Sequence, residues 1–363
     1  MTSPDPFLNT KRRPSVEGPF HVEELALSQR NSGMLLEALR HDVTPAGLHY
    51  LLIHFDVPYV PSADWHVEVA GRVKKPMSLS LETIKRMPAR TLRVTLECAG
   101  NGRALLSPRY PSMPWRHEAV GTADWTGTPL RHVLEQAGLA DDAVDIAFIG
   151  ADHGFDRGVE HDYARSLRRD AALSEDVLIV WEMNGQPLLP QHGYPLRLVV
   201  PGWYGMASVK WLKRIEVLDK PFDGFQQVQT YMYRASTDAP PVPVTRIRVK
   251  SLLVPPGIPD WFTRRRLVEA GPTALFGRAW SGEAPIVRVE VGVDGAWHEA
   301  ELDSPMGRFA WRGWRYTWDA APGEHEISCR ATDAKGETQP LDARFDIGGF
   351  GNNAVQRVRV KVR

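Results

Sequence analysis

The chain is short of cysteine, of net charge and of long apolar runs, and each shortage excludes a class of protein. Cys98 and Cys329 are its only two cysteines among 363 residues, so no disulfide framework stabilises the fold. Lys plus Arg and Asp plus Glu both number 44, which leaves no excess charge to attract nucleic acid or an anionic membrane. We therefore expect no nucleic-acid partner.

The N-terminal region shows neither a signal peptide nor a membrane span. The basic cluster Lys11–Arg13 is followed by Pro14 and then Glu17, not by an apolar segment. We predict a cytoplasmic protein with no membrane span, or a periplasmic one if a leader was removed. The sequence also has no Cys-x-x-Cys-His motif and no dinucleotide fingerprint, so we expect no haem or flavin on this chain.

The first part of the chain mixes short strands with short helices. Strands are expected over residues 65–69 and 176–181 because apolar or β-branched residues recur there. A helix is expected from Thr128, with Thr128 as its cap and Pro129 at the first helical position. Gly138 is expected to end that helix.

A proline-rich connector at residues 239–244 separates this part from a region with almost no helical periodicity. Valines alternate over residues 287–293 and lead into Asp294-Gly295, which predicts a β-hairpin. Further alternating segments at 327–331 and 358–362 predict more short strands. Together they favour a β-sandwich of immunoglobulin type.

Cys98 lies where a β-branched segment enters a glycine-rich loop, in the run TLECAGNGR from Thr95 to Arg103. A thiolate at such a position can bind a soft metal, and Arg103 can hold an anion beside it. The alternative is a small buried residue near a turn, because free cysteine usually behaves as a compact apolar group.

A second polar segment spans residues 182–212 and surrounds one strand with loops rich in glycine and proline. His192, Arg197 and Lys210 in this segment carry donors that suit a phosphate. Taken singly, each fits a surface charge or a hydrogen-bonded histidine better than a ligand site.

The two segments together resemble the sulfite oxidase family of molybdopterin-dependent oxidoreductases, and the resemblance runs from about Tyr50 to Val362. It implies an α+β chain, with a mixed α/β molybdopterin-binding domain followed by an all-β immunoglobulin-like sandwich for dimerisation. We expect an N-terminal extension at 1–45, the catalytic domain at 46–240 and the dimerisation domain at 241–363.

By this resemblance, Cys98 is the direct protein ligand to the metal of a molybdenum–molybdopterin cofactor. Positions that match the family's pterin-contacting residues are His54, Asp152, His192, Arg197, Ser208 and Lys210. Positions that match its substrate pocket are Arg103, Trp115, Tyr231 and Arg312, the last reaching in from the second domain. Tyr233 is an alternative to Tyr231, and Arg312 alternatively packs on nearby tryptophans at the rim.

The chain also departs from the family pattern. Leu52 stands where sulfite oxidases carry an arginine two residues before the histidine matched by His54, and this loss weakens attraction for a dianion. Ala207, Gly102 and Ser208 are further departures. His153 is a candidate to supply the missing positive charge.

The resemblance implies oxidation of sulfite to sulfate by oxygen-atom transfer in a homodimer, with electrons passed to an external acceptor such as a cytochrome or another redox protein. Leu52 keeps a nitrate reductase, or an S- or N-oxide reductase, open as an alternative. An alternative of another class is a non-catalytic binding or assembly protein. Its interaction surface would be built from the strand at 287–293 and the sandwich tryptophans Trp311, Trp314 and Trp318.

Overall fold

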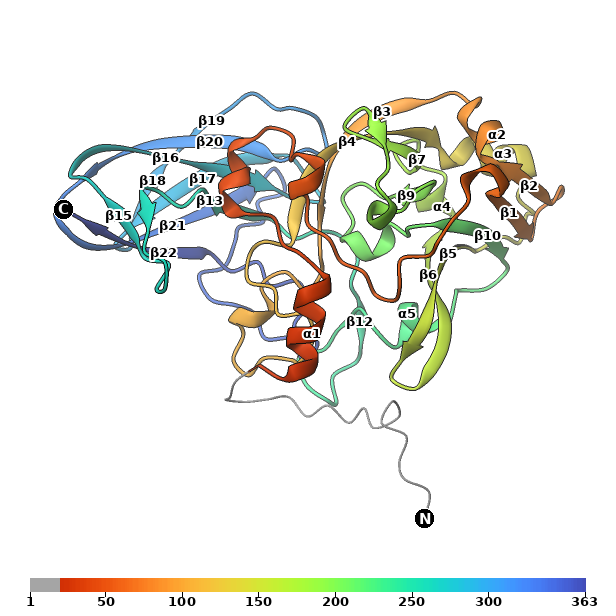
Figure 1. Ribbon diagram of the computed structural model, residues 1–363, viewed down its shortest axis with the longest axis horizontal. Helices are drawn as coiled ribbons and strands as arrows, with labels where there is room; N and C mark the ends of the chain where they lie inside the picture. The colour runs from red at the N-terminus through yellow and green to blue at the C-terminus, as the bar shows by residue number, and fades with distance from the viewer. Residues whose placement is uncertain (1–19) are drawn as a thin grey trace, which may run out of the picture.

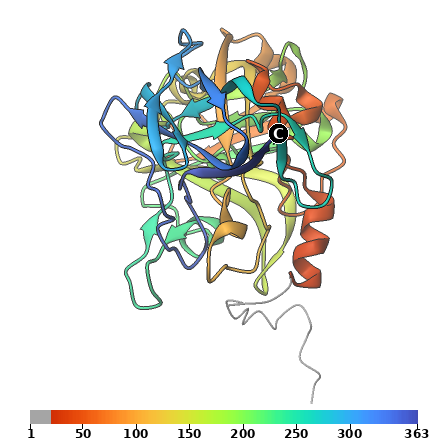
Figure 2. The ribbon, with the colours of Figure 1, turned by 90° about the vertical axis from the view of Figure 1, so that its left-hand side faces the viewer.

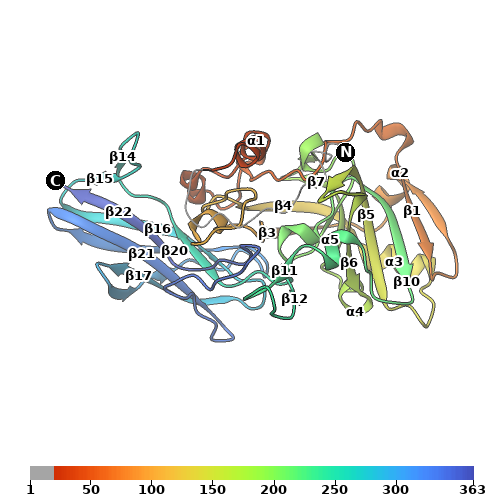
Figure 3. The same cartoon turned by 90° about the horizontal axis from the view of Figure 1, so that it is seen from below.

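The computed structural model describes residues 20–363. The Lys11–Arg13 cluster and residues 1–19 of the expected N-terminal extension lie outside the described residues. In the described part, a mixed α/β domain and an all-β domain lie side by side (Figures 1 and 3). No helix of this part is long and apolar enough to cross a membrane.

The segment before the first sheet packs at the boundary of the two domains. It contains helix α1 (Val22–Arg30) and the 3-10 helices η1 (Leu36–Arg40) and η2 (Ala46–Leu48). Leu39 of η1 is fully buried in one cluster with Trp280 and Trp311 of the sandwich. Figure 2 shows α1 along one side of the molecule when the sandwich faces the viewer.

The first domain contains two five-stranded sheets. One sheet has the order β2-β1-β10-β5-β6, in which only β1 and β10 run parallel. Its strands are β1 (His66–Gly71), β2 (Met77–Ser80), β5 (Asp145–Asp156), β6 (Val159–Arg168) and β10 (Leu212–Leu218). The other sheet is antiparallel and has the order β3-β4-β7-β8, with β9 paired to β7. Its strands are β3 (Arg90–Glu97), β4 (Val120–Pro129), β7 (Leu178–Met183), β8 (Gln186–Pro187) and β9 (Arg197–Val199).

Helices in this domain are short. They are α2 (Leu81–Lys85), α3 (Leu130–Ala137), α4 (Arg169–Ala172) and α5 (Phe225–Val228), with 3-10 helices η3 (Ser62–Asp64), η4 (Arg103–Leu105), η5 (Pro190–His192) and η6 (Gly205–Ala207). Helix α3 ends at Gly138 with a φ of 69°, as expected. The expected cap is wrong, because Thr128 Oγ1 donates to Pro88 O (2.9 Å) and Pro129 occupies the cap position.

The second domain is a sandwich of a four-stranded and a six-stranded sheet (Figure 3). The smaller sheet has the order β13 (Lys250–Leu253), β16 (Gly271–Trp280), β20 (Arg312–Ala320), β19 (Glu301–Leu302). The larger has the order β14 (Ile258–Pro259), β15 (Arg266–Val268), β22 (Gln356–Val362), β21 (Gly323–Asp333), β17 (Ile286–Val293), β18 (Ala296–Glu299). A short ribbon of β11 (Met232–Tyr233) and β12 (Val242–Pro243) precedes the sandwich.

The predicted hairpin is present in the larger sheet. Asp294 and Gly295 have φ angles of 50° and 87°, and the turn brings Val293 opposite Ala296. Of the four alternating valines at 287–293, only Val287 does not face the interior, since it is 52% exposed. The β17–β21 register shifts between Ile286 and Arg288, so Ile286 takes the inward position instead.

The expected tryptophan surface of the sandwich is wrong. Trp311, Trp314 and Trp318 are 0%, 1% and 6% exposed, so these rings fill the interior and present no binding face. Two of them also direct their indole N–H groups to internal acceptors. The structure therefore removes the tryptophan part of the basis for the non-catalytic alternative.

A buried ion pair joins the two domains. Lys250 Nζ lies 2.9 Å from Glu97 Oε1, and both side chains are 2% exposed. Trp280 Nε1 donates to the other carboxylate oxygen of Glu97 (2.8 Å), and Lys250 also donates to Asn352 O (3.0 Å). Because Glu97 precedes Cys98 in the chain, the sandwich holds the start of the cysteine loop directly.

Candidate active site

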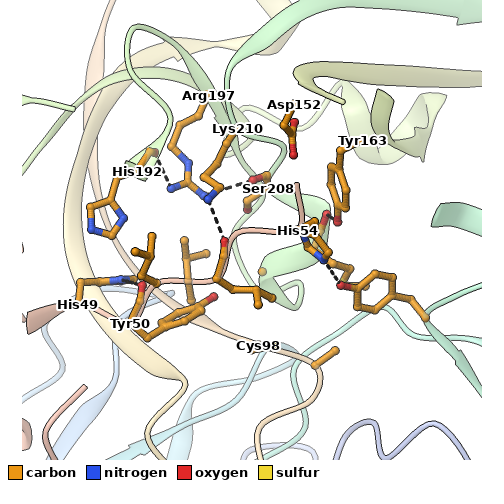
Figure 4. A pocket seen from close by; sticks show the side chains of 17 residues that line it. His49, Tyr50, His54, Cys98, Asp152, Tyr163, His192, Arg197, Ser208 and Lys210 are labelled. Carbon is orange, nitrogen blue, oxygen red and sulfur yellow. Dashed lines mark hydrogen bonds between the residues drawn. The ribbon is translucent and has the colours of Figure 1, made fainter. Parts of the chain in front are cut away.

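A buried pocket of about 50 Å³ lies in the first domain (Figure 4). A larger cleft of about 870 Å³ lies next to it and shares part of its lining. The residues that line both cavities are Leu52, His54, Cys98 and Tyr231. Cys98 therefore lies where the inner pocket meets the outer cleft.

Strand β3 ends at Glu97, and Cys98 begins the loop that follows. The Cys98 N–H donates to Ala119 O (2.9 Å), which fixes the loop against the start of β4. Burial raises the pKa of the Cys98 thiol, while the nearby Arg103 charge and the Gly100 amide oppose that rise. The thiol is 6% exposed, so it is reached from the cavities and not from bulk solvent.

Two glycines give the cysteine loop its shape. A Cβ on Gly100 would lie 2.7 Å from Arg103 Nη1, so the absence of a side chain lets the guanidinium pack on the loop. Gly102 has a φ of 97° and closely approaches Asn352 of the sandwich. The departure at Gly102 thus has a local reason, because the loop turns through a left-handed conformation there.

Arg103 lines the outer cleft, although much of its donor capacity is already used. Its Nε donates to Gly348 O (3.0 Å) and its Nη1 to Met113 O (3.3 Å). The guanidinium also lies over the Phe350 ring, 5.1 Å from the centroid. Trp115 is buried in the same wall, and its indole N–H is directed at the Cys98 thiol, where it helps to oppose the rise in the thiol pKa.

Arg197 lies across the inner pocket from Cys98 (Figure 4). Its Nη1 donates to His192 O (2.9 Å) and its Nη2 to Ser208 O (3.2 Å). Burial lowers its pKa to about 10, so the group stays cationic at neutral pH. Its Nε has no partner in the described chain and is free to bind an anion.

Lys210 and Asp152 are two further ionisable residues beside Arg197. Lys210 Nζ donates to Leu52 O (2.8 Å) and Gln191 O (3.1 Å). Burial lowers the pKa of Lys210 and raises that of Asp152, and each opposite charge resists the shift of the other. Asp152 is 3% exposed, and its Oδ1 has no partner among the described residues.

Three histidines contribute uncharged rings to the inner pocket. Burial lowers the pKa of His49 to about 4 and the pKa values of His54 and His192 to about 3. The rings of His49 and His192 meet edge to face, with centroids 5.7 Å apart. At neutral pH each ring therefore offers one donor and one acceptor but no charge.

Tyr231 lines both cavities, and its hydroxyl contacts His54 Nε2 at 2.6 Å. His54 also stacks on Tyr163, with ring centroids 4.4 Å apart, and Tyr163 donates to Met206 O (2.8 Å). Tyr233 instead lies under Arg248, whose Cζ is 4.3 Å from the ring centroid. Of the two tyrosines considered, the structure brings Tyr231 to the site.

Two expected residues do not reach the site. Arg312 donates to Asp303 O (2.7 Å) and Ile286 O (2.9 Å), so these carbonyls hold it inside the sandwich. His153 is 52% exposed and contacts carboxylates at the surface, because it follows buried Asp152 and points to the opposite face of β5. Neither residue supplies a cation to the cavities.

Four pocket residues or neighbours were missed by sequence reasoning: His49, Tyr50, Tyr163 and Arg165. His49, Tyr50 and Tyr163 line the inner pocket, and Arg165 lies behind it. The signal for Arg165 was present, since Tyr163, Arg165 and Leu167 alternate on the buried face of β6. An arginine in the inward register of a strand is unusual.

The chemistry of the inner pocket fits an anionic cofactor with many hydrogen-bonding edges. Arg197 supplies a buried positive charge, and half-buried Lys210 lies beside it with a pKa that burial lowers to about 7. His49 Nε2, Asp152 Oδ1 and Arg197 Nε have no partner within the described residues, which is rare for buried polar atoms. No group of three or more His, Cys, Asp or Glu side chains in residues 20–363 is arranged to hold a metal, so a metal at Cys98 would take its other ligands from the cofactor.

The fold and this pocket define the class of a molybdopterin-binding oxidoreductase. The family model of the oxidoreductase molybdopterin binding domain matches residues 54–226. The model of the Mo-co oxidoreductase dimerisation domain matches residues 244–363 and supports a homodimer. The chain belongs to the molybdenum-dependent sulfite oxidase family.

Relatives with two different activities resemble the chain to a similar degree. Mitochondrial sulfite oxidase of Mus musculus is 32% identical over 384 residues, which cover 99% of this chain and 67% of that protein. NADH nitrate reductase 2 of Phaseolus vulgaris is 30% identical over 371 residues, but the match covers only 41% of the plant protein. The nitrate reductase of Petunia hybrida is 32% identical, with 40% of its length matched.

A solved structure matches almost the whole described fold. The sulfane dehydrogenase SoxCD from Paracoccus pantotrophus has a TM-score of 0.80 and 25% sequence identity, with 99% of this chain and 97% of that chain covered. The expected fold class is confirmed: a mixed α/β molybdopterin domain followed by an immunoglobulin-like sandwich.

Proposed function

We propose that this protein oxidises sulfite to sulfate with a molybdenum–molybdopterin cofactor and passes the electrons to an external redox protein. The observation that carries the proposal is the position of Cys98, a buried thiol that lines both a pocket containing Arg197 and Lys210 and an open cleft. A structural cysteine needs neither cavity. The proposed active form is a homodimer, with domains at 46–240 and 241–363.

The inner pocket is the proposed cofactor site. Cys98 would be the one protein ligand to the metal. The residues proposed to hold the pterin and its phosphate are His49, Tyr50, His54, Asp152, His192, Arg197, Ser208 and Lys210. The bound cofactor would supply the oxygen-atom transfer and the two-electron redox change.

The outer cleft is the proposed path of the substrate. Arg103 would hold the anion by charge, and Trp115 would form the wall beside it. Tyr231 stays protonated because burial raises its pKa, and with His54 Nε2–H as the donor in their contact, Tyr231 Oη can donate to a substrate oxygen. Neutral His54 contacts that same hydroxyl at 2.6 Å and holds the ring in place.

Nitrate reduction is the second candidate. Leu52 lines both cavities and puts an apolar side chain where a further cation is usual in sulfite oxidases. Nitrate carries one negative charge and needs less compensation than a dianion. The identities of 30% and 32% to nitrate reductases favour neither substrate over the other.

The test compares both reactions on one cofactor-loaded preparation. Sulfite-dependent reduction of ferricyanide is measured beside nitrate reduction driven by reduced viologen dye, each normalised to bound molybdenum. We expect sulfite turnover to exceed nitrate turnover. Strong nitrate turnover without sulfite oxidation would overturn the proposal in favour of the second candidate.

A further inference from the structure

The positive charge around the proposed substrate site is smaller than the family pattern implies. Leu52 removes one cation and Arg312 is held in the sandwich. Arg157 and Arg234 line the outer cleft, but Arg157 is 36% exposed and pairs with Asp156 (3.4 Å). Arg103 and Arg234 remain as cations that line the cleft, and a further positive charge near its inner end would add to theirs.

Arg165 is a buried cation behind this inner end. It lies on β6, two residues beyond Tyr163 on the same buried face, and is 3% exposed. Its Cζ lies 5.4 Å from the centroid of the Tyr231 ring. Its Nη1 donates to Gln226 O, and its Nε has no hydrogen-bond partner anywhere in residues 20–363.

The charge of Arg165 is not neutralised locally. Burial lowers the pKa of Arg165, and no carboxylate of residues 20–363 forms an ion pair with its guanidinium. Burying an unpaired cation is unfavourable, and an anion bound nearby would offset that cost. The same charge acts on His54 and Tyr231, both of which line the two cavities.

We infer that Arg165 supplies the positive charge that Leu52 no longer provides and positions the Tyr231 ring at the oxyanion site. The inference rests on the proposed function, because it concerns how that site holds its anion. Arg165 lines neither cavity, so it is a positioning residue that acts through Tyr231 and through its field. In a poorly solvated interior such a field decays less steeply than at the surface.

The experiment measures binding of sulfate, the product of the proposed reaction, by calorimetry on the cofactor-loaded protein, and steady-state sulfite oxidation on the same samples. Arg165→Met should weaken sulfate binding and raise the sulfite KM by roughly tenfold, with a smaller change in kcat. Arg165→Lys should stay within about threefold of wild type, because the charge remains. The double variant Leu52→Arg/Arg165→Met should recover most of the sulfate binding. Binding would not recover if Arg165→Met had weakened it only by disturbing the local structure.

Arg169→Met is the matched control, since Arg169 is half-buried just after β6 and donates to the carbonyls of Ala140 and Asp141 away from the cavities. It should leave sulfate binding unchanged. If Arg165→Met does not fold, Arg165→Gln carries the same comparison with a donor retained. Unchanged sulfate binding in the neutral variant, or no rescue by Leu52→Arg, overturns the inference. Absence of sulfite turnover in wild type would refute the proposed function alone, because sulfate binding still decides the role of Arg165.

Discussion

The two cysteines, one in each domain, are both buried but have very different surroundings. Cys329 lies on β21 between Ile327 and Ala331, is 0% exposed, and is packed on all sides by the sandwich core. Cys98 is 6% exposed, lines two cavities and has the Arg103 charge near it. Burial raises the pKa of Cys329 to about 12 and also raises that of Cys98, where Arg103 opposes the rise. Burial alone therefore does not distinguish a structural thiol from a proposed metal ligand. What sets Cys98 apart is that it has cavities and a cationic side chain next to it.

The same contrast extends to the domains. Within residues 20–363, every buried side-chain nitrogen or oxygen without a hydrogen-bond partner lies between His49 and Arg197, and none lies in the sandwich. The sandwich pairs its internal polar groups, as Trp314 does with Ser251 at 2.9 Å. Buried polar atoms are normally paired, and three of these unpaired ones, His49 Nε2, Asp152 Oδ1 and Arg197 Nε, belong to residues that line the inner pocket, where a bound ligand would pair them.

The largest effect should come from the cysteine beside the cavities. Cys98→Ser should lower sulfite turnover by more than about 100-fold, because even groups that only support a metal ligand typically change affinity or activity 10–100-fold. Turnover and molybdenum content are measured together on protein from a cofactor-competent host. Full turnover by Cys98→Ser would refute the proposed ligand role.

The second largest effect is expected at the Glu97–Lys250 ion pair between the two domains. It is an effect on stability. Lys250→Met leaves Glu97 charged and buried without its partner, which should cost about 3–5 kcal/mol of unfolding free energy. Urea unfolding measures the loss. Lys335→Met is the control, because Lys335 pairs with Glu283 at 2.6 Å on the surface and should contribute less than about 1 kcal/mol.

The double variant Glu97→Gln/Lys250→Met sharpens this prediction. It removes both buried charges and should recover part of the lost stability. A loss in Lys250→Met no larger than in Lys335→Met would contradict the view that the sandwich holds the cysteine loop.

Local sequence patterns were sufficient to predict the structure where residues close together in the chain determine it. Asp294-Gly295 predicted the hairpin because left-handed φ angles favour these residue types. Residues near one another in motifs, such as Arg197 and Lys210, do come together at one pocket. Cys98 joins them because β3 delivers it to the same wall.

Contacts between distant segments decided the rest. Arg312 is held by carbonyls of β17 and of the segment after β19, which no spacing in the sequence reveals. Thr128 bonds Pro88 across 40 positions instead of capping its own helix. Arg165 approaches Tyr231 only because β6 packs against the segment after α5.

A smaller effect is expected at the sandwich cysteine. Cys329→Ser replaces a sulfur in an apolar core with a hydroxyl and should cost about 1–3 kcal/mol of unfolding free energy. Unlike Cys98→Ser, it should leave kcat per molybdenum unchanged. Unfolding and turnover are measured on the same preparation, and loss of turnover without loss of stability would break the comparison between the two thiols.

The smallest expected effect is a pH-dependent one in the sandwich, at His325. Its Nδ1 lies 2.7 Å from Asp294 Oδ2, and this contact raises the pKa of His325, while the Glu326 N–H and His325 lower that of Asp294. The raised histidine pKa stabilises the fold below the unfolded value of about 6.5, and the contribution disappears as pH rises through the folded value. The aspartate contribution is present above its unfolded pKa of about 3.9 and is lost as pH falls through the lower folded value.

His325→Gln should therefore destabilise the protein most between about pH 4 and pH 6.5, by less than about 1 kcal/mol because Asp294 is 50% exposed. Urea unfolding of wild type and variant at pH 5.5 and pH 8.5 measures the difference. The difference should shrink at the higher pH while kcat matches wild type at both. A difference that grows with pH would show that the pair does not act through the charged histidine. A change in kcat would show that a charge in the sandwich affects the proposed active site. We expect no such effect, because the buried polar side chains of the sandwich have hydrogen-bond partners within residues 20–363.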